Sequence, residues 1–263
     1  MAYYGPLMDF SMSGLSDKMG LQEGGKAVLK GKIFLLAAGM CLTLGMTGCT
    51  VKEMNEISDK SAFTETASQT ENPVENRVAS FSTKGAKGSC IILYAKDGEY
   101  IVATASHVAE KLEEVSIDGQ AALVTEYGRS PDFDLIFVRA QMNGTEEDKM
   151  QCETVTLEAY NELKEGDMIV ICGSVADEKV YQEGKVLSPW IYMEDFGYHM
   201  LWGEVSDVRG GMSGGGVFDG NGRLVGMIVG GDADKQIAVM PISILAAEWK
   251  NSDLDAPIDI FLN

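Results

Sequence analysis

From about residue 80 to residue 242, short apolar runs alternate with polar, turn-forming residues. The clearest runs are "CIILYA" (90–95), "EYIVATA" (99–105), "DLIFVRA" (134–140), "DMIVICGS" (167–174) and "QIAVMPI" (236–242). Each has the length and the β-branched or aromatic content of a strand. Strands at such regular spacing predict an all-β domain, either a sandwich or a barrel.

Turn signals divide these runs. Asp97-Gly98 predicts a tight hairpin, "DGQ" (118–120) predicts a second, and Gly220-Asn221-Gly222 marks another tight turn. Only two stretches have a helical pattern, "HVAEKLEE" (107–114) and "ISILAAEWK" (242–250), and the second is expected to close the domain.

The front of the chain has a different composition. Residues 33–48, "IFLLAAGMCLTLGMTG", carry no charge and follow three lysines, which is the pattern of a secretory signal peptide. The run is short for a membrane span, which needs about 20 apolar residues. "LGMTGC", ending at Cys49, resembles the lipobox of bacterial lipoproteins, although Met46 stands where leucine is usual. The resemblance implies lipidation at Cys49, with plain secretion and an uncleaved anchor as alternatives.

Residues 49–80 are rich in Ser, Thr, Glu and Asn and have few large apolar side chains. Such a segment buries too little surface to offset its ordering entropy, so we expect a flexible tether. Residues 1–48 are then an N-terminal extension with the signal, and the tether leads from a membrane anchor to the folded part.

Composition excludes several classes of function. Forty acidic residues against 21 basic ones give a net charge of -19, which disfavours a nucleic-acid partner. The five cysteines form no Cys-x-x-Cys pair and the chain has only two histidines, so we expect no metal site and no cofactor.

One serine lies within the glycine-rich stretch "RGGMSGGGVFDGNG" (209–222). Gly211, Ser213 and Gly215 fit Gly-x-Ser-x-Gly, and the stretch lacks the Gly-Lys-Ser/Thr of a phosphate-binding loop. In α/β-hydrolases with this pattern, the histidine follows the serine. Here both histidines precede Ser213, which excludes that class.

The order His, Asp, Ser remains available for nucleophilic catalysis. His107 follows a predicted strand, where a loop can present it as the base that a serine nucleophile requires. Asp134 directly begins an apolar strand and is favoured as the orienting acid over Asp132, which follows a proline in a loop. His199 lies in an alternating strand and is interpreted as structural.

Three segments in this order carry a family resemblance. "TASH", "DLIFVR" and "GMSGG", with Gly211–Gly215 as the last, resemble the histidine, aspartate and serine motifs of chymotrypsin-fold serine proteases of the bacterial trypsin-like and HtrA type. The resemblance implies two antiparallel Greek-key β-barrels with the active site between them. It implies His107 as general base, Asp134 as its orienting acid and Ser213 as the nucleophile that forms an acyl-enzyme.

The resemblance also implies an oxyanion hole formed by the N–H groups of Gly211 and Ser213, and a substrate-binding edge at Ile228, Val229 and Gly230. On this basis residues 81–253 form the protease domain, with an N-terminal barrel at about 81–155 and a C-terminal barrel at about 156–245. Residues 254–263 are left as a tail, and no PDZ domain is expected.

Three departures from the family pattern affect function. Met212 replaces the aspartate that pairs with a freed N-terminus in trypsin-like zymogens, so activation by N-terminal cleavage is not expected. Cys90 and Cys172 lie in apolar strands and are expected to pack as small hydrophobes, while Cys152 has the option of pairing with one of them. Asp207 lies six residues before Ser213, which gives a hypothesis of Lys or Arg preference.

Taken together, these features predict a lipid-anchored serine endopeptidase outside the cytoplasmic membrane, acting on protein or peptide substrates. The alternative is a catalytically silent protease fold that serves as a surface binding module.

Overall fold

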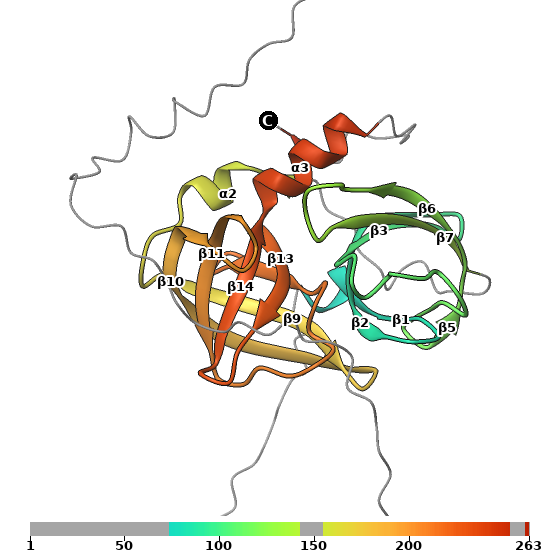
Figure 1. The fold of residues 1–263 in the computed structure, drawn as a ribbon, viewed down its shortest axis with the longest axis horizontal. Helices are drawn as coiled ribbons and strands as arrows, with labels where there is room; N and C mark the ends of the chain where they lie inside the picture. The colour runs from blue at the N-terminus through green and yellow to red at the C-terminus, as the bar shows by residue number, and fades with distance from the viewer. Residues whose placement is uncertain (1–73, 143–154, 253–260, 263) are drawn as a thin grey trace, which may run out of the picture.

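The computed structural model describes residues 74–142, 155–252 and 261–262. Most of these residues lie in strands, which form a seven-stranded sheet and a closed six-stranded barrel placed side by side (Figure 1). The all-β prediction is confirmed.

The N-terminal unit is an antiparallel sheet with the strand order β5-β4-β1-β2-β3-β7-β6, and it curls into an incomplete barrel (Figure 1). Its strands are β1 (Val78–Ser82), β2 (Lys87–Lys96), β3 (Glu99–Thr104), β4 (Ser116–Ile117), β5 (Gln120–Ala121), β6 (Leu123–Arg129) and β7 (Ile136–Gln141).

The C-terminal unit is a closed antiparallel barrel in the order β10-β11-β14-β13-β12-β9. Its strands are β9 (Met168–Val175), β10 (Glu178–Met193), β11 (Tyr198–Val205), β12 (Gly216–Asp219), β13 (Leu224–Gly231) and β14 (Gln236–Pro241). Every residue of β13 is buried, which explains its unbroken apolar sequence.

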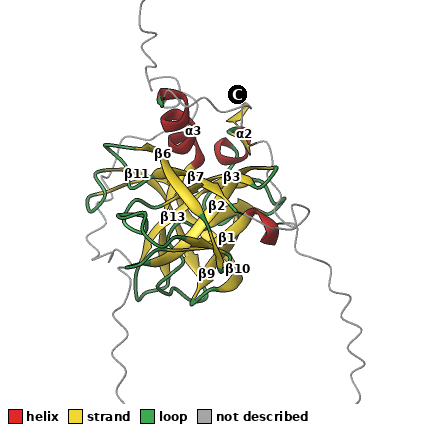
Figure 2. Cartoon of the chain, turned by 90° about the vertical axis from the view of Figure 1, so that its right-hand side faces the viewer, coloured by secondary structure: helices red, strands yellow, loops and turns green. Residues whose placement is uncertain are grey.

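Few other elements accompany the strands. They are the 3₁₀ turn η1 (Glu75–Arg77), the helices α2 (Glu158–Asn161) and α3 (Ile242–Asn251), and a parallel pair of β8 (Val155–Thr156) with β15 (Phe261–Leu262). Both helices lie at the same end of the molecule (Figure 2). Within the described ranges, no helix has the length and apolarity required to cross a membrane.

The predicted hairpin turns form as expected. Asp97 and Gly98 have φ angles of 52° and 79°, and Asp118 and Gly119 have φ angles of 47° and 73°. Two successive positive φ angles match the right-handed twist of the flanking strands, so each turn joins its strands without splaying them.

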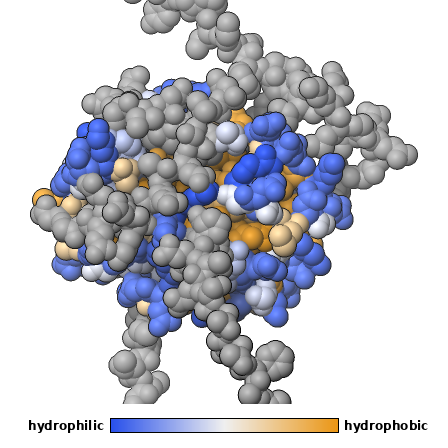
Figure 3. Space-filling view, turned by 180° about the vertical axis from the view of Figure 1, so that it is seen from behind, coloured by the Kyte–Doolittle hydropathy of each residue, from blue (hydrophilic) through white to orange (hydrophobic). Residues whose placement is uncertain are grey.

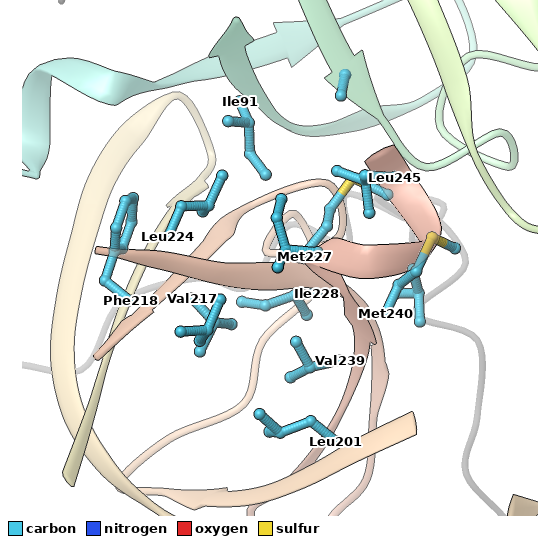
Figure 4. Packing of buried hydrophobic residues seen from close by; sticks show 14 of the residues in the cluster. Ile91, Leu201, Val217, Phe218, Leu224, Met227, Ile228, Val239, Met240 and Leu245 are labelled. Carbon is cyan, nitrogen blue, oxygen red and sulfur yellow. The ribbon is translucent and has the colours of Figure 1, made fainter. Parts of the chain in front are cut away.

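Alternate side chains of β2 enter two different hydrophobic cores. Cys90 and Ile92 pack inside the N-terminal sheet, whereas Ile91 and Leu93 join the core of the C-terminal barrel. Figure 4 shows Ile91 beside residues of the barrel such as Met227. Because the strand is buried on both faces, it reads as a continuous apolar run rather than an alternating one. The two units therefore share packed side chains.

The helix α3 provides a second connection between the units. It begins directly after β14 and buries Ile242, Leu245, Ala246 and Trp249 on one side. The Trp249 ring meets the ring of Phe137 edge-on at 5.1 Å, so this helix of the C-terminal unit packs on the N-terminal sheet. The prediction of a closing helix is confirmed.

The predicted helix at residues 107–114 is wrong. Beyond His107 the chain forms turns and bends, in which the N–H groups of Val108 and Ala109 donate to the Ala105 carbonyl. The N–H of His107 is used by an aspartate from another loop, and Glu114 has a φ of 52°, outside helical geometry. Tertiary contacts thus override a helical side-chain pattern.

The expected tether overlaps the folded part of the chain. Residues 74–80, assigned above to its end, form η1 and the first residues of β1, and Val74 and Val78 are buried. Arg77 donates to the carbonyl of Gly222, which ties this segment to the C-terminal barrel. The signal segment 33–48, Cys49 and Cys152 lie outside the described residues.

The described surface that is visible from behind is mainly hydrophilic, with an apolar strip near its centre (Figure 3).

Candidate active site

His107 and Asp134 are brought together by two neighbouring strand ends. Thr104, the last residue of β3, pairs with Ile136, the first residue of β7, so the loops beyond them start from the same edge. Asp134 accepts two hydrogen bonds from His107, one from the ring Nδ1 at 2.5 Å and one from the backbone N–H at 2.9 Å. The imidazole is therefore fixed in orientation, and its Nε2 points to the opposite side of the ring.

Asp132 does not take part in this contact. It is exposed, and its N–H donates to Ser130 at 3.2 Å. Phe133, between the two aspartates, packs edge-on against Tyr198 at 4.8 Å between ring centroids. Burial raises the pKa of the Tyr198 phenol, and the negative charge of Asp134 raises it further. Asp134 therefore has a neutral aromatic neighbour.

The second histidine lies elsewhere. His199 is exposed on β11, where it stacks on Trp190 at 4.8 Å and meets Tyr192 edge-on at 5.4 Å. These contacts are to aromatic residues of β10, which agrees with the structural interpretation of His199.

The loop that carries Ser213 meets the histidine loop over Gly88 of β2. A methyl group built on Gly88 would lie 2.5 Å from a side-chain carbon of Val108 and 3.0 Å from the carbonyl oxygen of Ser213. Only glycine permits both loops to rest on this strand position. Val108, which follows His107, and Ser213 therefore both lie close to Gly88, although they are more than 100 positions apart in sequence.

Strand β13 fixes the serine loop from the other side. The N–H of Gly214 donates to the carbonyl of Ile228 at 2.8 Å, and the N–H of Ile228 donates to the carbonyl of Gly215 at 2.8 Å. Ile228 is fully buried. Both of its backbone groups are therefore used to hold the serine loop, so we place Ile228 among the residues that support Ser213 rather than among those that contact a substrate.

Val229 and Gly230 of the expected substrate edge, and Gly231 after them, are buried like the rest of β13, but their backbone lacks a paired strand on one side. Strand β12 pairs with one side of β13, and this pairing ends where Gly216 lies opposite Met227. Strand β14 pairs with the other side of β13 and continues as far as Gly231. In the described part of the chain, no strand pairs with Val229–Gly231 on the side of the serine loop. This edge can accept the backbone of an added strand.

Two backbone N–H groups at and near the serine have no partner in the described residues. Gly211 has a φ of 105°, and a methyl group on it would lie 2.6 Å from the carbonyl oxygen of Ser174. Among the described residues, the N–H groups of Gly211 and Ser213 have no hydrogen-bond acceptor. Unpaired N–H groups at such a position suit an incoming negative oxygen.

Two reactive atoms are also without partners. The Oγ of Ser213 and the Nε2 of His107 are both buried, and neither makes a hydrogen bond within the described ranges. An unpaired buried polar atom costs about 1–3 kcal/mol. An unpaired buried polar atom in a native protein calls for an explanation, and a catalytic role is one of them.

Asp207 is paired with a neighbour. Its carboxylate accepts from Nε of Arg209 at 2.7 Å, and its side chain is 55 % exposed. Gln182 of β10 clamps the same loop, since it donates to the Asp207 carbonyl at 2.8 Å and accepts from the Asp207 N–H at 3.0 Å. The charge proposed to select a basic substrate residue is thus neutralised by an adjacent cation.

Met212 lies fully buried beneath the serine loop. Its sulfur accepts from the N–H of Arg209 at 3.4 Å, and the Nε2 of Gln182 lies 4.0 Å away. An apolar side chain therefore fills the place of the zymogen aspartate. Cys90 and Cys172 are buried free thiols, as expected, and burial raises the pKa of Cys90.

The described residues contain no cluster of three or more His, Cys, Asp or Glu side chains suited to a metal ion. Sequence reasoning missed Gly88 and Ser89, which lie directly beneath the serine loop. The only signal was a Gly-Ser pair at the start of a strand, which is too common to assign.

An incomplete barrel and a closed barrel, with a histidine–aspartate pair in the first and a serine in a glycine-rich loop of the second, define a chymotrypsin-like serine protease fold. The chain belongs to the trypsin-like peptidase domain family, whose model matches residues 88–227, more than half of the sequence. A comparison with curated protein sequences finds no match.

Solved structures with the same fold include bacterial proteases. The active form of the Rv3671c protease from M. tuberculosis aligns with a TM-score of 0.55 at 16 % identity, covering 72 % of this chain and 86 % of that one. An inactive Ser343Ala mutant of Rv3671c from M. tuberculosis H37Rv aligns at 0.54 and 18 % identity, covering 70 % and 90 %. A serine endoprotease from Yersinia pestis aligns at 0.54 and 14 % identity, covering 68 % and 63 %. The TM-scores of these alignments show a shared fold, and the identities of 14–18 % support nothing more specific.

Proposed function

We propose that this protein is a serine endopeptidase that uses Ser213, His107 and Asp134 as a catalytic triad. The observation that carries the proposal is the double hydrogen bond from His107 to Asp134, which leaves a buried, unpaired Nε2 in a site that also holds an unpaired Ser213 Oγ. Contacts between nucleophile and base are often loose without substrate and tighten on binding.

In the first half of the reaction, Nε2 of His107 takes the proton of Ser213 Oγ as this oxygen bonds to the carbonyl carbon of the scissile peptide. The carbonyl π electrons move to its oxygen, which the N–H groups of Gly211 and Ser213 stabilise. The carbonyl then re-forms, the C–N bond breaks, and the imidazolium gives its proton to the leaving nitrogen. The product is a Ser213 acyl ester and a free amine.

In the second half, water attacks the ester carbon and gives a proton to His107. The ester bond breaks, and Ser213 Oγ recovers that proton from the imidazolium. The net reaction is peptide plus water to acid plus amine. Asp134 keeps the required tautomer of His107 and stabilises its charged form throughout.

The open edge at Val229–Gly231 favours a polypeptide substrate, because an extended chain can add there by backbone hydrogen bonds. The buried Met212 supports a site that forms without an ion pair to a new N-terminus. We therefore propose that activity does not depend on a cleavage that frees a new N-terminus at the protease domain.

We also propose that the protein is exported and anchored by lipid at Cys49. The support is the uncharged run 33–48 with its lysine flank and the lipobox-like "LGMTGC". Growth of expressing cells with an alkyne fatty acid is expected to label the wild type and Cys41→Ala but not Cys49→Ala. Cys41 lies in the same apolar run, so loss of labelling in both variants, or in neither, would contradict the assignment.

The endopeptidase proposal is tested with a fluorophosphonate probe and a peptide library on the full chain. We expect Ser213→Ala to lose both labelling and cleavage. Ser206→Ala, a change of an exposed serine seven residues earlier, should keep both. Absence of labelling in the wild type would instead support a binding module with a protease fold.

A further inference from the structure

Ser89 of β2 makes four hydrogen bonds beneath the serine loop and is fully buried. Its hydroxyl accepts from the N–H of Ser174 at 2.7 Å and donates to the carbonyl of Gly211 at 2.8 Å. A backbone N–H can only donate, so the single hydroxyl proton must go to Gly211. The direction of this relay is therefore fixed by chemistry.

The backbone of Ser89 holds the next part of the same loop. Its N–H donates to the carbonyl of Ser213 at 2.8 Å, while its own carbonyl accepts from Oγ1 of Thr104 at 2.6 Å. One residue thus holds the carbonyl groups of Gly211 and Ser213, the two residues whose N–H groups form the proposed oxyanion hole.

We propose that Ser89 is a positioning residue that sets the oxyanion hole, a role that rests on the proposed peptidase function. Holding a residue's carbonyl restricts rotation of its backbone and the plane of the peptide that follows it. Gly211 needs such a restraint most, because it has no Cβ and a φ of 105° that glycine occupies with little steric penalty.

The surroundings leave little space for another arrangement. A methyl group built on Gly214 would lie 2.0 Å from the carbonyl oxygen of Ser89 and 2.5 Å from Oγ1 of Thr104. The loop therefore rests on Ser89 at van der Waals distance, and interiors packed this closely transmit small shifts.

Replacing Ser89 with alanine removes only the hydroxyl. The N–H of Ser174 then loses its acceptor and the carbonyl of Gly211 loses its donor, while the backbone bond to Ser213 stays. We expect the Gly211–Met212 peptide to sample other orientations, and through the backbone rotation of Gly211 the preceding N–H to lose part of its alignment. Donors stabilise the oxyanion only when they are already aimed at it, so the transition state is affected more than substrate binding.

The test compares Ser89→Ala with Ser80→Ala in the full chain. Ser80 is a buried serine directly opposite Ser89 on β1, so it controls for loss of a buried hydroxyl in the same sheet. We expect Ser89→Ala to lower kcat by about 10- to 100-fold, the scale of a small misplacement, with KM nearly unchanged. Affinity for a peptide boronic acid, whose adduct places an oxygen in the hole, should fall by a similar factor.

A second variant separates a loss of positioning from a loss of folding. Ser89→Cys keeps a side chain of similar shape with a weaker donor, and we expect a smaller loss of kcat than for alanine. Unfolding midpoints of all variants are measured in urea. The positioning role would be overturned if kcat fell equally in Ser80→Ala and Ser89→Ala and only in step with the urea midpoint of unfolding.

Hydrogen exchange gives a readout that does not need activity. We expect Ser89→Ala to exchange faster than the wild type in the peptide that covers residues 209–215, and Ser80→Ala to match the wild type there. If the wild type shows no Ser213-dependent labelling, the peptidase proposal fails, and this exchange still decides whether Ser89 holds the loop. Equal exchange in both variants would contradict it.

Discussion

Asp134 holds His107 at two points, the ring Nδ1 and the backbone N–H, so a single carboxylate sets both the tautomer of the imidazole and the course of its loop. The two residues are 27 positions apart and meet because β3 and β7 are paired neighbours. This relationship makes Asp134 the most direct test of the proposed triad.

Asp134→Asn is expected to lower kcat by about 10⁴-fold at neutral pH. The amide can still accept one bond, but it cannot stabilise the imidazolium and favours the wrong tautomer. The rate of peptide hydrolysis measures this effect. Asp132→Asn, two residues away and exposed, is the matched control and should change kcat less than 2-fold, because its carboxylate is in solvent. A large effect of Asp132→Asn would point to the wrong acid.

The wild type is not expected to prefer Lys or Arg before the cleaved bond, because Asp207 is already paired with Arg209. Arg209→Ala frees the carboxylate and should raise kcat/KM for basic peptides relative to aliphatic ones by at most about 5-fold, the value of an exposed charge pair. Paired libraries of basic and aliphatic peptides provide the measurement. Adding Asp207→Asn to Arg209→Ala should abolish the gain, and a gain that persists would show another origin.

Gly214→Ala is expected to destabilise the fold by at least about 1–3 kcal/mol. The added methyl would overlap the carbonyl of Ser89, and the φ of 86° is unfavourable for alanine. Urea unfolding followed by tryptophan fluorescence measures the change. Gly210→Ala, where a methyl meets nothing within 4 Å, is the control and should be close to neutral. Equal effects of both would show that backbone freedom, not the contact with Ser89, matters.

Lys87 and Asp177 form an ion pair between β2 of the N-terminal sheet and the β9–β10 turn of the barrel. The bonds from Lys87 and from Ser82 lower the pKa of Asp177 below its usual value of 3.8. The ionised carboxylate therefore contributes stability above pH 3.8, which is lost as pH falls through the lower folded-state pKa.

Asp177→Asn should cost about 0.2–1 kcal/mol at pH 7, because the pair is partly exposed, and the cost should shrink below pH 3.8. Asparagine suits the φ of 69° at this position, so strain does not confuse the comparison. Urea midpoints of the two proteins against pH, with and without salt, measure it. A difference independent of pH would exclude the ion pair as its cause.

Much of the fold was predictable because the signals are local. Alternation and turn chemistry act within a few residues, so the strands and the turn at Asp97-Gly98 follow directly from sequence. Ala176 and Asp177 adopt the same pair of positive φ angles with no glycine, and sequence gave no reason to expect this. That turn joins β9 to β10, which pair from Val175 opposite Glu178 onward.

The expected helix at residues 107–114 shows the opposite case. Its residue types favour a helix, but the segment forms turns and bends, and Glu114 has a φ of 52°. Local preference amounts to a few tenths of a kcal/mol per residue. A preference of this size is readily overridden by tertiary context.

Sequence alone determined the order in which a candidate base, acid and nucleophile occur and excluded the α/β-hydrolase arrangement, because these residue types and their chain order can be read directly. The tertiary structure decided which aspartate meets His107, that Asp207 is neutralised, and that Ser89 lies beneath Gly211. The Ser89–Gly211 contact spans 122 positions and the Ser89–Ser174 contact 85. Hydrogen bonds between residues so far apart in sequence depend on how the two barrels pack, and no local sequence pattern encodes that packing.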